Sequence, residues 1–202
     1  RSISTAVFSK LFFIKKVNSP FDQNSRVALT MLMDNHKIDT GKWDKIREHS
    51  LLTSVSIADG VLAIDQCAFY ECTSLTTIPI PDTVTHIGFS AFYGCTSLTR
   101  VTIPNSVTSI GNHAYRNCTS LTAICIPVSV TSIDYEAFRG CTSLTTVTIP
   151  DRVTEIGLGV FHSCTSLTSV NMPKSMTFIG NSSFYGCTSL TSVSIPDNVS
   201  SL

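Results

Sequence analysis

The strongest constraint on the fold of this chain is a tetrapeptide that recurs at a fixed interval. Cys-Thr-Ser-Leu begins at six positions, each 23 residues after the one before: Cys72, Cys95, Cys118, Cys141, Cys164 and Cys187. A fixed period of this length is typical of architectures in which each copy is one structural unit stacked on the next. An earlier, degraded copy starts at Leu52, which gives seven repeat starts from Leu52 to Leu190.

Each copy carries a pattern of apolar residues that a single coil cannot bury alone. In the third copy, Val101 and Ile103 alternate with polar residues, which predicts a short strand with one inward face. Pro104 lacks a backbone donor and ends that strand. The positions expected in the core are Leu98, Val101, Ile103, Val107, Ile110, Ala114 and Tyr115. The sequence therefore predicts a parallel β-solenoid of about seven coils.

The repeat resembles a known family. Residues 92–98 (FYGCTSL) followed by residues 101–111 (VTIPNSVTSIG) are similar to the BspA-type leucine-rich repeat, over about residues 51–202. The resemblance implies a right-handed leucine-rich-repeat solenoid with a binding role and without catalytic residues. Relatives of this kind include bacterial and protist cell-surface proteins implicated in adhesion. The sequence stops partway through a repeat, so we expect residues 51–202 to be truncated at the C-terminal end of a longer repeat array.

Residues 20–50 lack the repeat, and we expect them to form a short helical N-terminal cap over the first coil. Ser19 suits a helix N-cap and Pro20 the first helical position. The apolar face of this predicted helix is Val27, Ala28, Met31 and Leu32. A second short helix is predicted over Thr40–His49.

Residues 1–19 form a basic amphipathic arm, with Lys10, Lys15 and Lys16 interleaved with apolar residues and no acidic residue before Asp22. Such a segment can contact a membrane, a glycan or a partner, or be the remnant of an organellar targeting peptide. It can equally be a strand or arm that packs on the same protein or a neighbour.

No motif for catalysis, a cofactor or a metal occurs in the chain, so an enzyme is the least favoured class. His86, His113 and His162 occupy different positions of the repeat, so we expect solvent-facing side chains rather than metal ligands. The formal net charge is zero, which argues against nucleic acid as a partner.

The recurring cysteines are expected to be buried free thiols that act as small hydrophobic residues, because parallel side chains cannot form a relaxed disulfide. Cys125 falls on an outward strand position and is the expected reactive thiol. The turn position before each recurring cysteine is glycine in only three copies, which argues against a strict positive φ there.

Two surfaces are candidates for partner binding. The outward strand positions are small and almost uncharged, mostly Ser and Thr, and the departures from this are Pro79, Arg100, Cys125 and Asn171. The position two residues before each cysteine is bulkier, reading Tyr70, Tyr93, Arg116, Arg139, His162 and Tyr185. Aromatic and arginine side chains dominate binding hot spots, so we favour the second surface and keep the strand face as the alternative.

The sequence thus predicts a non-enzymatic protein-interaction module, either an adhesive surface protein or a scaffold subunit docked in a larger assembly. A hydroxyl array that orders water or ice is the alternative, although only Thr146 and Thr148 place threonine at both outward positions of one coil. Cell-surface placement follows from the resemblance, and placement inside an organelle or complex would follow if the arm is a targeting remnant.

Overall fold

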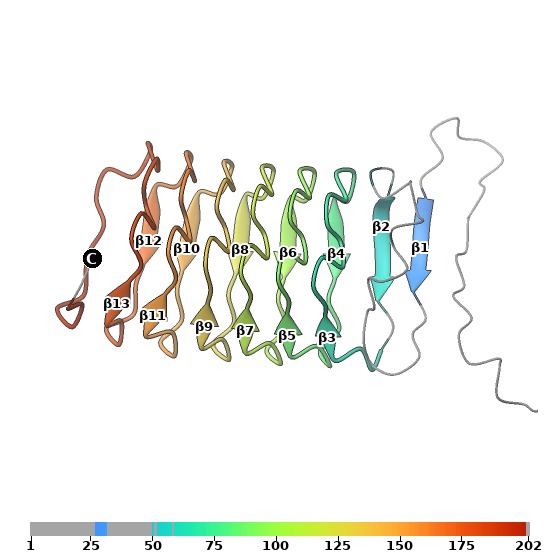
Figure 1. The fold of residues 1–202 in the computed structure, drawn as a ribbon, viewed down its shortest axis with the longest axis horizontal. Coiled ribbons are helices and arrows are strands. Elements are labelled where there is room, and N and C mark those ends of the chain that lie inside the picture. The colour runs from blue at the N-terminus through green and yellow to red at the C-terminus, as the bar shows by residue number, and fades with distance from the viewer. Residues whose placement is uncertain (1–26, 32–49, 51, 58, 201–202) are drawn as a thin grey trace, which may run out of the picture.

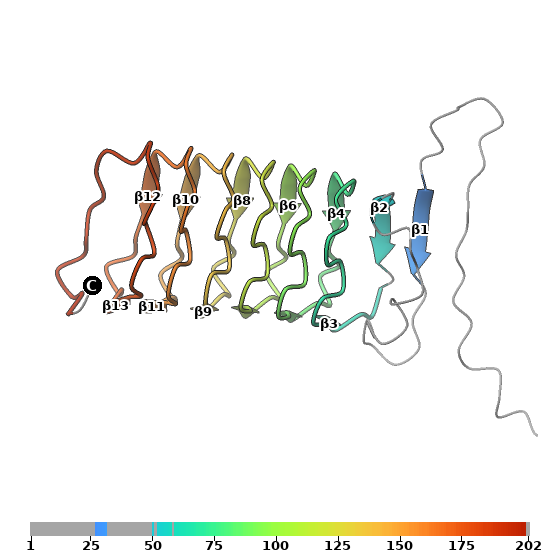
Figure 2. The ribbon, with the colours of Figure 1, turned by 45° about the horizontal axis from the view of Figure 1, so that its top comes forward.

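The computed structural model describes residues 27–31, 50, 52–57 and 59–200. In this part the chain winds into coils that stack along one axis, so that neighbouring repeats lie side by side (Figure 1). Figure 2 shows the same stack turned, with the strands of successive coils again aligned. No α-helix occurs among the described residues.

Two parallel sheets run along the stack. The first sheet has the order β1 (Val27–Met31), β2 (Leu52–Ile57), β4 (Thr77–Pro79), β6 (Arg100–Thr102), β8 (Ala123–Cys125), β10 (Thr146–Thr148) and β12 (Ser169–Asn171). The second sheet consists of β3 (Ala63–Ile64), β5 (His86–Ile87), β7 (Ser109–Ile110), β9 (Ser132–Ile133), β11 (Glu155–Ile156) and β13 (Phe178–Ile179).

The register of the strands confirms the predicted period. Thr77 pairs with Arg100, and Val101 pairs with Ile124, in each case 23 residues apart. Six of the seven predicted repeat starts lead into a strand of the first sheet, from β2 to β12. The seventh copy, which starts at Leu190, has no strand within its described residues.

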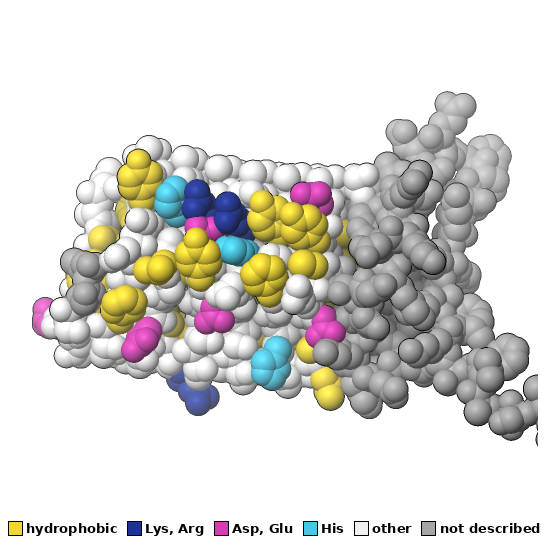
Figure 3. Space-filling model, viewed as in Figure 1, with side chains coloured by type: hydrophobic (Ala, Val, Ile, Leu, Met, Phe, Trp, Pro, Cys, Tyr) yellow, Lys and Arg dark blue, Asp and Glu magenta, His cyan; other side chains and the backbone are white. Residues whose placement is uncertain are grey.

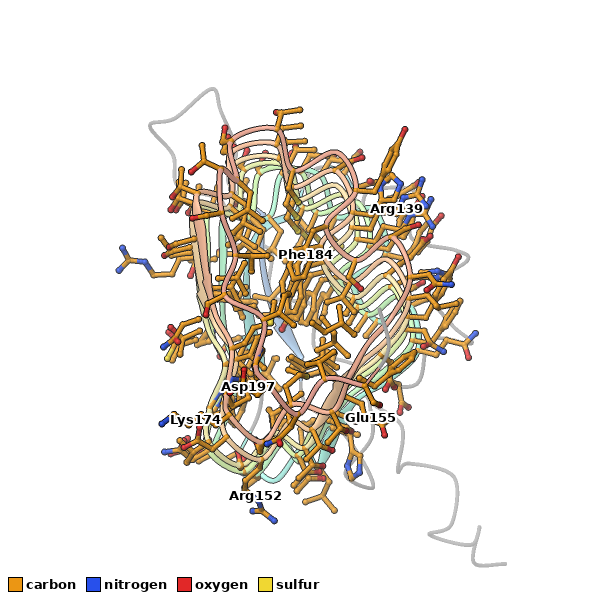
Figure 4. The ribbon with its side chains drawn as sticks, turned by 90° about the vertical axis from the view of Figure 1, so that its left-hand side faces the viewer. Arg139, Arg152, Glu155, Lys174, Phe184 and Asp197 are labelled. Carbon is orange, nitrogen blue, oxygen red and sulfur yellow. The ribbon has the colours of Figure 1, made fainter. Side chains whose placement is uncertain are left out.

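The core lies between the two sheets and matches the predicted positions. All seven core residues predicted for the third copy are at most 4% exposed. One interior column stacks its rings along the whole axis, with centroids 5.1–5.8 Å apart: Phe69, Phe92, Tyr115, Phe138, Phe161 and Phe184. In Figure 4, which looks along the stack, Phe184 lies in the interior.

Recurring cysteine and threonine side chains of the repeat form rows of hydrogen bonds between neighbouring coils. The six recurring cysteines are buried and free, as predicted, and Cys118 Sγ donates a hydrogen bond to Phe92 O at 3.1 Å. The threonines after five of the repeat leucines do the same, from Thr76 to Thr168, as where Thr99 Oγ1 donates to Thr76 O at 3.3 Å. Much of the hydroxyl content of the chain therefore satisfies the backbone of the preceding coil.

The helix predicted within the cap is wrong over residues 27–31, the part of it that the structure describes. Residues 27–31 form strand β1, which pairs in parallel with β2 up to Met31 and Ile57. The edge of the first coil presents unpaired backbone groups, and a strand satisfies them whereas a helix does not. The predicted helix over Thr40–His49 and the arm 1–19 lie outside the described residues.

The expectation about the turn before each cysteine is also wrong. Glu71, Asn117 and Ser163 have positive φ there, between 53° and 61°, as do the glycines of the other copies. The N–H of each such residue reaches the neighbouring coil, as where Asn117 N donates to Arg139 O at 2.7 Å. These hydrogen bonds offset the strain that a side chain adds at positive φ.

Candidate functional site

The six bulky side chains two residues before each cysteine form one continuous line along the solenoid, called here the aromatic–arginine row. It consists of Tyr70, Tyr93, Arg116, Arg139, His162 and Tyr185. The rings of Tyr70 and Tyr93 stack at one end with their centroids 4.8 Å apart. At the other end, the ring centroids of His162 and Tyr185 are 5.0 Å apart. Figure 3 shows hydrophobic, basic and histidine side chains following one another across this face.

The members of the row differ in exposure. Tyr70 and Tyr185 are exposed, Tyr185 by 69%, whereas Tyr93 and the two arginines are half-buried. The guanidinium carbon of Arg116 lies 5.8 Å from the centroid of the Tyr93 ring. The row is therefore a stack of flat groups that offers mainly its outer edges to a partner.

A buried carboxylate holds the centre of the row in place. Glu136 is 3% exposed, and Nη1 of both Arg116 and Arg139 donates to its carboxylate, one to each oxygen. Hydrogen bonds between charged groups are stronger than neutral ones and fix direction as well as distance. Glu136 thus fixes two guanidinium groups side by side on neighbouring coils.

The local electrostatics follow from burial and from these charges. Burial favours the neutral acid, but hydrogen bonds from Tyr135 and Arg139 and the charges of both arginines outweigh it, so the pKa of Glu136 is lowered. Burial also lowers the pKa of His113, and the arginines lower it further against the opposing effect of Glu136. Glu136 is therefore a carboxylate at neutral pH, and His113 is mostly neutral.

A second line of large side chains runs beside the row. Phe89, Tyr135 and Leu158 are 44%, 41% and 46% exposed. His113 lies between two of them, with its ring centroid 5.4 Å from Phe89 and 4.9 Å from Tyr135. Its Nε2 is 3.4 Å from Glu136 Oε2 without a hydrogen bond. The apolar line and the arginine pair therefore belong to one surface.

The structure corrects the expectation for the histidines in part. His86 is exposed, but His113 and His162 pack against aromatic rings rather than facing solvent. Among the described residues, no group of three or more His, Cys, Asp or Glu is placed to hold a metal ion. No helix among them is long and apolar enough to span a membrane.

The alternative strand-face residues are more dispersed. Pro79, Arg100, Cys125 and Asn171 are all exposed on the outward side of the first sheet. Pro79 and Arg100 border an open depression of about 330 Å³ together with Asp82. Cys125 and Asn171 do not line it. Among these four residues, Arg100 is the one charged side chain and none is aromatic.

Glu136 was missed by the sequence reasoning, although it organises the site. Its repeat position holds Cys67, Ser90, His113, Gly159 and Ser182 in other coils, so a carboxylate there breaks the pattern. The signal that could have found it is this break, three residues before Arg139 in a coil that follows Arg116.

The comparisons with known proteins agree with the geometry. Residues 46–167 and 112–202 match the BspA type leucine rich repeat region, with six copies. The chain belongs to the BspA-type leucine-rich repeat family. Proteins of the leucine-rich repeat class act in protein interaction or at surfaces, and they generally bind other proteins. No curated protein matches this BspA-type chain.

Several solved structures share the fold. The T. pallidum leucine-rich repeat protein TpLRR is 28% identical, with a TM-score of 0.60 over 87% of this chain and 91% of that one. A leucine-rich cell surface protein from Faecalibacterium prausnitzii is 31% identical, with a TM-score of 0.59 over 85% of this chain and 51% of its own length. The pneumococcal vaccine antigen PcpA is 17% identical, with a TM-score of 0.56 over 73% of this chain and 44% of the PcpA chain. PcpA supports the fold alone.

Proposed function

We propose that this chain is a non-enzymatic protein-interaction module that binds another protein through the aromatic–arginine row. The observation that carries the proposal is the row itself, with two arginines held by Glu136 between a stacked tyrosine pair and the tilted pair of His162 and Tyr185. Tyrosine and arginine bury large areas and offer oriented donors, which is why they dominate binding hot spots. The Ser/Thr strand face offers little of either.

We place this module on a cell surface as an adhesive protein. Support comes from the F. prausnitzii relative, which is described as a cell surface protein and is 31% identical to this chain. A repeat array suits that role because each added coil extends the exposed surface without altering the fold. The scaffold role remains the other setting for the same surface.

The ordering of water or ice gains no support. Recurring threonine hydroxyls, such as those of Thr99 and Thr122, donate to the backbone of the preceding coil. The structural role of the repeat therefore explains these hydroxyls, and the outward strand positions remain irregular.

The test begins with cross-linked capture of a partner from the source cells, its identification by mass spectrometry and its purification. Its affinity is then measured for three variants. Tyr93→Ala with Arg116→Ala is expected to weaken binding by more than about 2 kcal/mol, the hot-spot threshold. Thr102→Ala with Thr148→Ala serves as the matched control on the strand face and should change little. Loss of binding only with the strand-face pair or with Arg100→Ala would assign binding to the opposite side.

A further inference from the structure

The charges of the aromatic–arginine row are not required by the fold. The coils that hold Arg116 and Arg139 repeat the same core as their neighbours, with Ala114 and Ala137 buried at equivalent positions. The other coils place tyrosine or histidine in the row, and the position of Glu136 holds a cysteine, serine or glycine in four of them and His113 in the fifth. Because the repeats are internal controls for one another, the charged group is a local addition to a scaffold that folds without it.

The arrangement leaves donors of both arginines available. Each guanidinium uses Nη1 on Glu136, and the Nη2 of neither one makes a hydrogen bond to the described residues. The arginine side chains are 27% and 34% exposed, whereas that of Glu136 is 4% exposed. Two positive charges against one buried negative charge leave a net charge of about +1 at neutral pH, facing outward. A partner can therefore reach the arginines but not the carboxylate.

The surroundings decide which kind of anion fits. Phe89, Tyr135 and Leu158 flank the charged group and expose over 40% of their surface each. A site for a polysulfated or polyphosphorylated chain needs a run of basic residues, whereas this surface has one arginine pair among apolar side chains. A carboxylate surrounded by apolar side chains complements it better.

We propose that Arg116 and Arg139 form a binding site for an aspartate or glutamate carboxylate of an acidic protein segment that also carries aromatic or aliphatic side chains. Glu136 is the positioning residue that holds both guanidinium groups toward that carboxylate. Arginine recognises carboxylates through planar, paired donors, and Nη2 supplies one such donor from each coil. This inference rests on the proposed function and names the chemistry of the partner.

The test uses an acidic and aromatic polypeptide as the probe. Binding of poly(Glu,Tyr) to the full chain is compared with binding of poly-Glu and of heparin at the same ionic strength. The wild-type chain should bind poly(Glu,Tyr) most tightly, and Arg116→Gln with Arg139→Gln should weaken this by about tenfold or more. Tighter binding of heparin would overturn the proposal in favour of a sulfated glycan.

A second pair of variants separates a site from a general charge effect. Arg152→Gln with Lys174→Gln removes the same charge from exposed positions, and both residues lie away from Arg139 in Figure 4. This control should bind poly(Glu,Tyr) like the wild type. An equal loss in the control would show that net charge alone attracts the probe, which would overturn the site.

The role of Glu136 has its own readout. Glu136→Gln makes the surface more positive, so a purely electrostatic surface would bind the probe more tightly. We expect weaker binding instead, by about threefold to tenfold, with partial rescue by Glu136→Asp, because the arginines lose their anchor. Circular dichroism verifies that both variants are folded, and tighter binding by Glu136→Gln would overturn the positioning role.

The carboxylate site and the protein-interaction role can fail separately. If a purified natural partner depends on Tyr93 and Tyr185 but is unaffected by Arg116→Gln with Arg139→Gln, the carboxylate site is wrong and the interaction role stands. If the same partner depends on neither the tyrosines nor the arginines, the proposed function of the row is wrong as well.

Discussion

Tyr115 is the one tyrosine in an interior column that otherwise holds phenylalanine. Its hydroxyl is buried without a hydrogen-bond partner, and burial raises the pKa of this group well above its usual value. A buried polar group without a partner costs about 1–3 kcal/mol. We therefore expect Tyr115→Phe to raise the free energy of unfolding by about that amount, as measured by urea denaturation followed by circular dichroism.

The repeat provides the reverse experiment in the neighbouring coil. Phe92 is equally buried and stacks on Tyr115 with centroids 5.1 Å apart. Phe92→Tyr places a hydroxyl in the same kind of environment and should destabilise the protein by a similar amount. If Tyr115→Phe were destabilising instead, its hydroxyl would have a partner that the described residues do not supply.

The sequence predicts the burial of side chains at positions that recur in every copy, and it misses a side chain that occurs in one copy alone. Leu98 and Val101 were placed in the core because a fixed period assigns every copy of a position to one environment. Glu136 was not placed, because its partners Arg116 and Arg139 lie on two coils and at another repeat position. An ion pair of this kind depends on how side chains turn between coils, which periodicity does not encode.

In each of the first six copies, two residues have positive φ in the turn that leads to the recurring cysteine: the residue directly before the cysteine and the residue five before it. Ser182 has φ of 60° and is exposed, whereas Ser189 is exposed in the same coil without positive φ. Glycine removes a strain of roughly 1 kcal/mol at the first position but adds only chain entropy at the second. We expect Ser182→Gly to stabilise by about 0.5 kcal/mol and Ser189→Gly to destabilise by about as much.

Thermal unfolding by calorimetry compares the two glycine variants directly. The prediction concerns the opposite signs of the two shifts in Tm, because both substitutions remove the same side chain. Equal losses in both variants would mean that the hydrogen bonds between coils hold the turn without measurable strain at Ser182.

The cysteine ladder is an element that thiol chemistry can test. Burial raises the pKa of Cys72 and Cys141 to about 12, whereas Cys125 is exposed on β8. Because the thiolate is the reactive form, iodoacetamide should modify Cys125 first in the native protein and the ladder only after denaturation. Peptide mass spectrometry gives the order of labelling. Disulfides between ladder cysteines in the unreduced protein would contradict it.

Strand β1 shows why an element outside the repeat was harder to predict. The segment 27–31 reads VALTM, and its apolar residues fit a helix face as well as an alternating strand. The edge of β2 decides between these, since pairing there satisfies the backbone of both strands. Such an edge is visible only once the neighbouring coil is folded.

For the whole molecule, the period fixed the class of fold, because no coil of 23 residues can bury its apolar face alone. The location of the aromatic–arginine row also followed from the period, since residues one repeat apart lie on neighbouring coils. The charge balance of that surface did not follow, because it depends on Glu136 being buried beneath the arginines.

Stability in such a stack should depend on how many neighbours a coil has. Leu98 is fully buried with a coil on each side, whereas Leu190 is half-buried in the seventh copy, which pairs no strand with β12 among the described residues. Leu98→Ala should therefore cost about 2–5 kcal/mol and Leu190→Ala roughly half of that or less. Urea denaturation of both variants measures the difference, and hydrogen exchange should be faster in residues 190–200 than in the third copy. Equal losses would mean that the seventh copy is packed as tightly as the third, and that the stack is more uniform than its strands indicate.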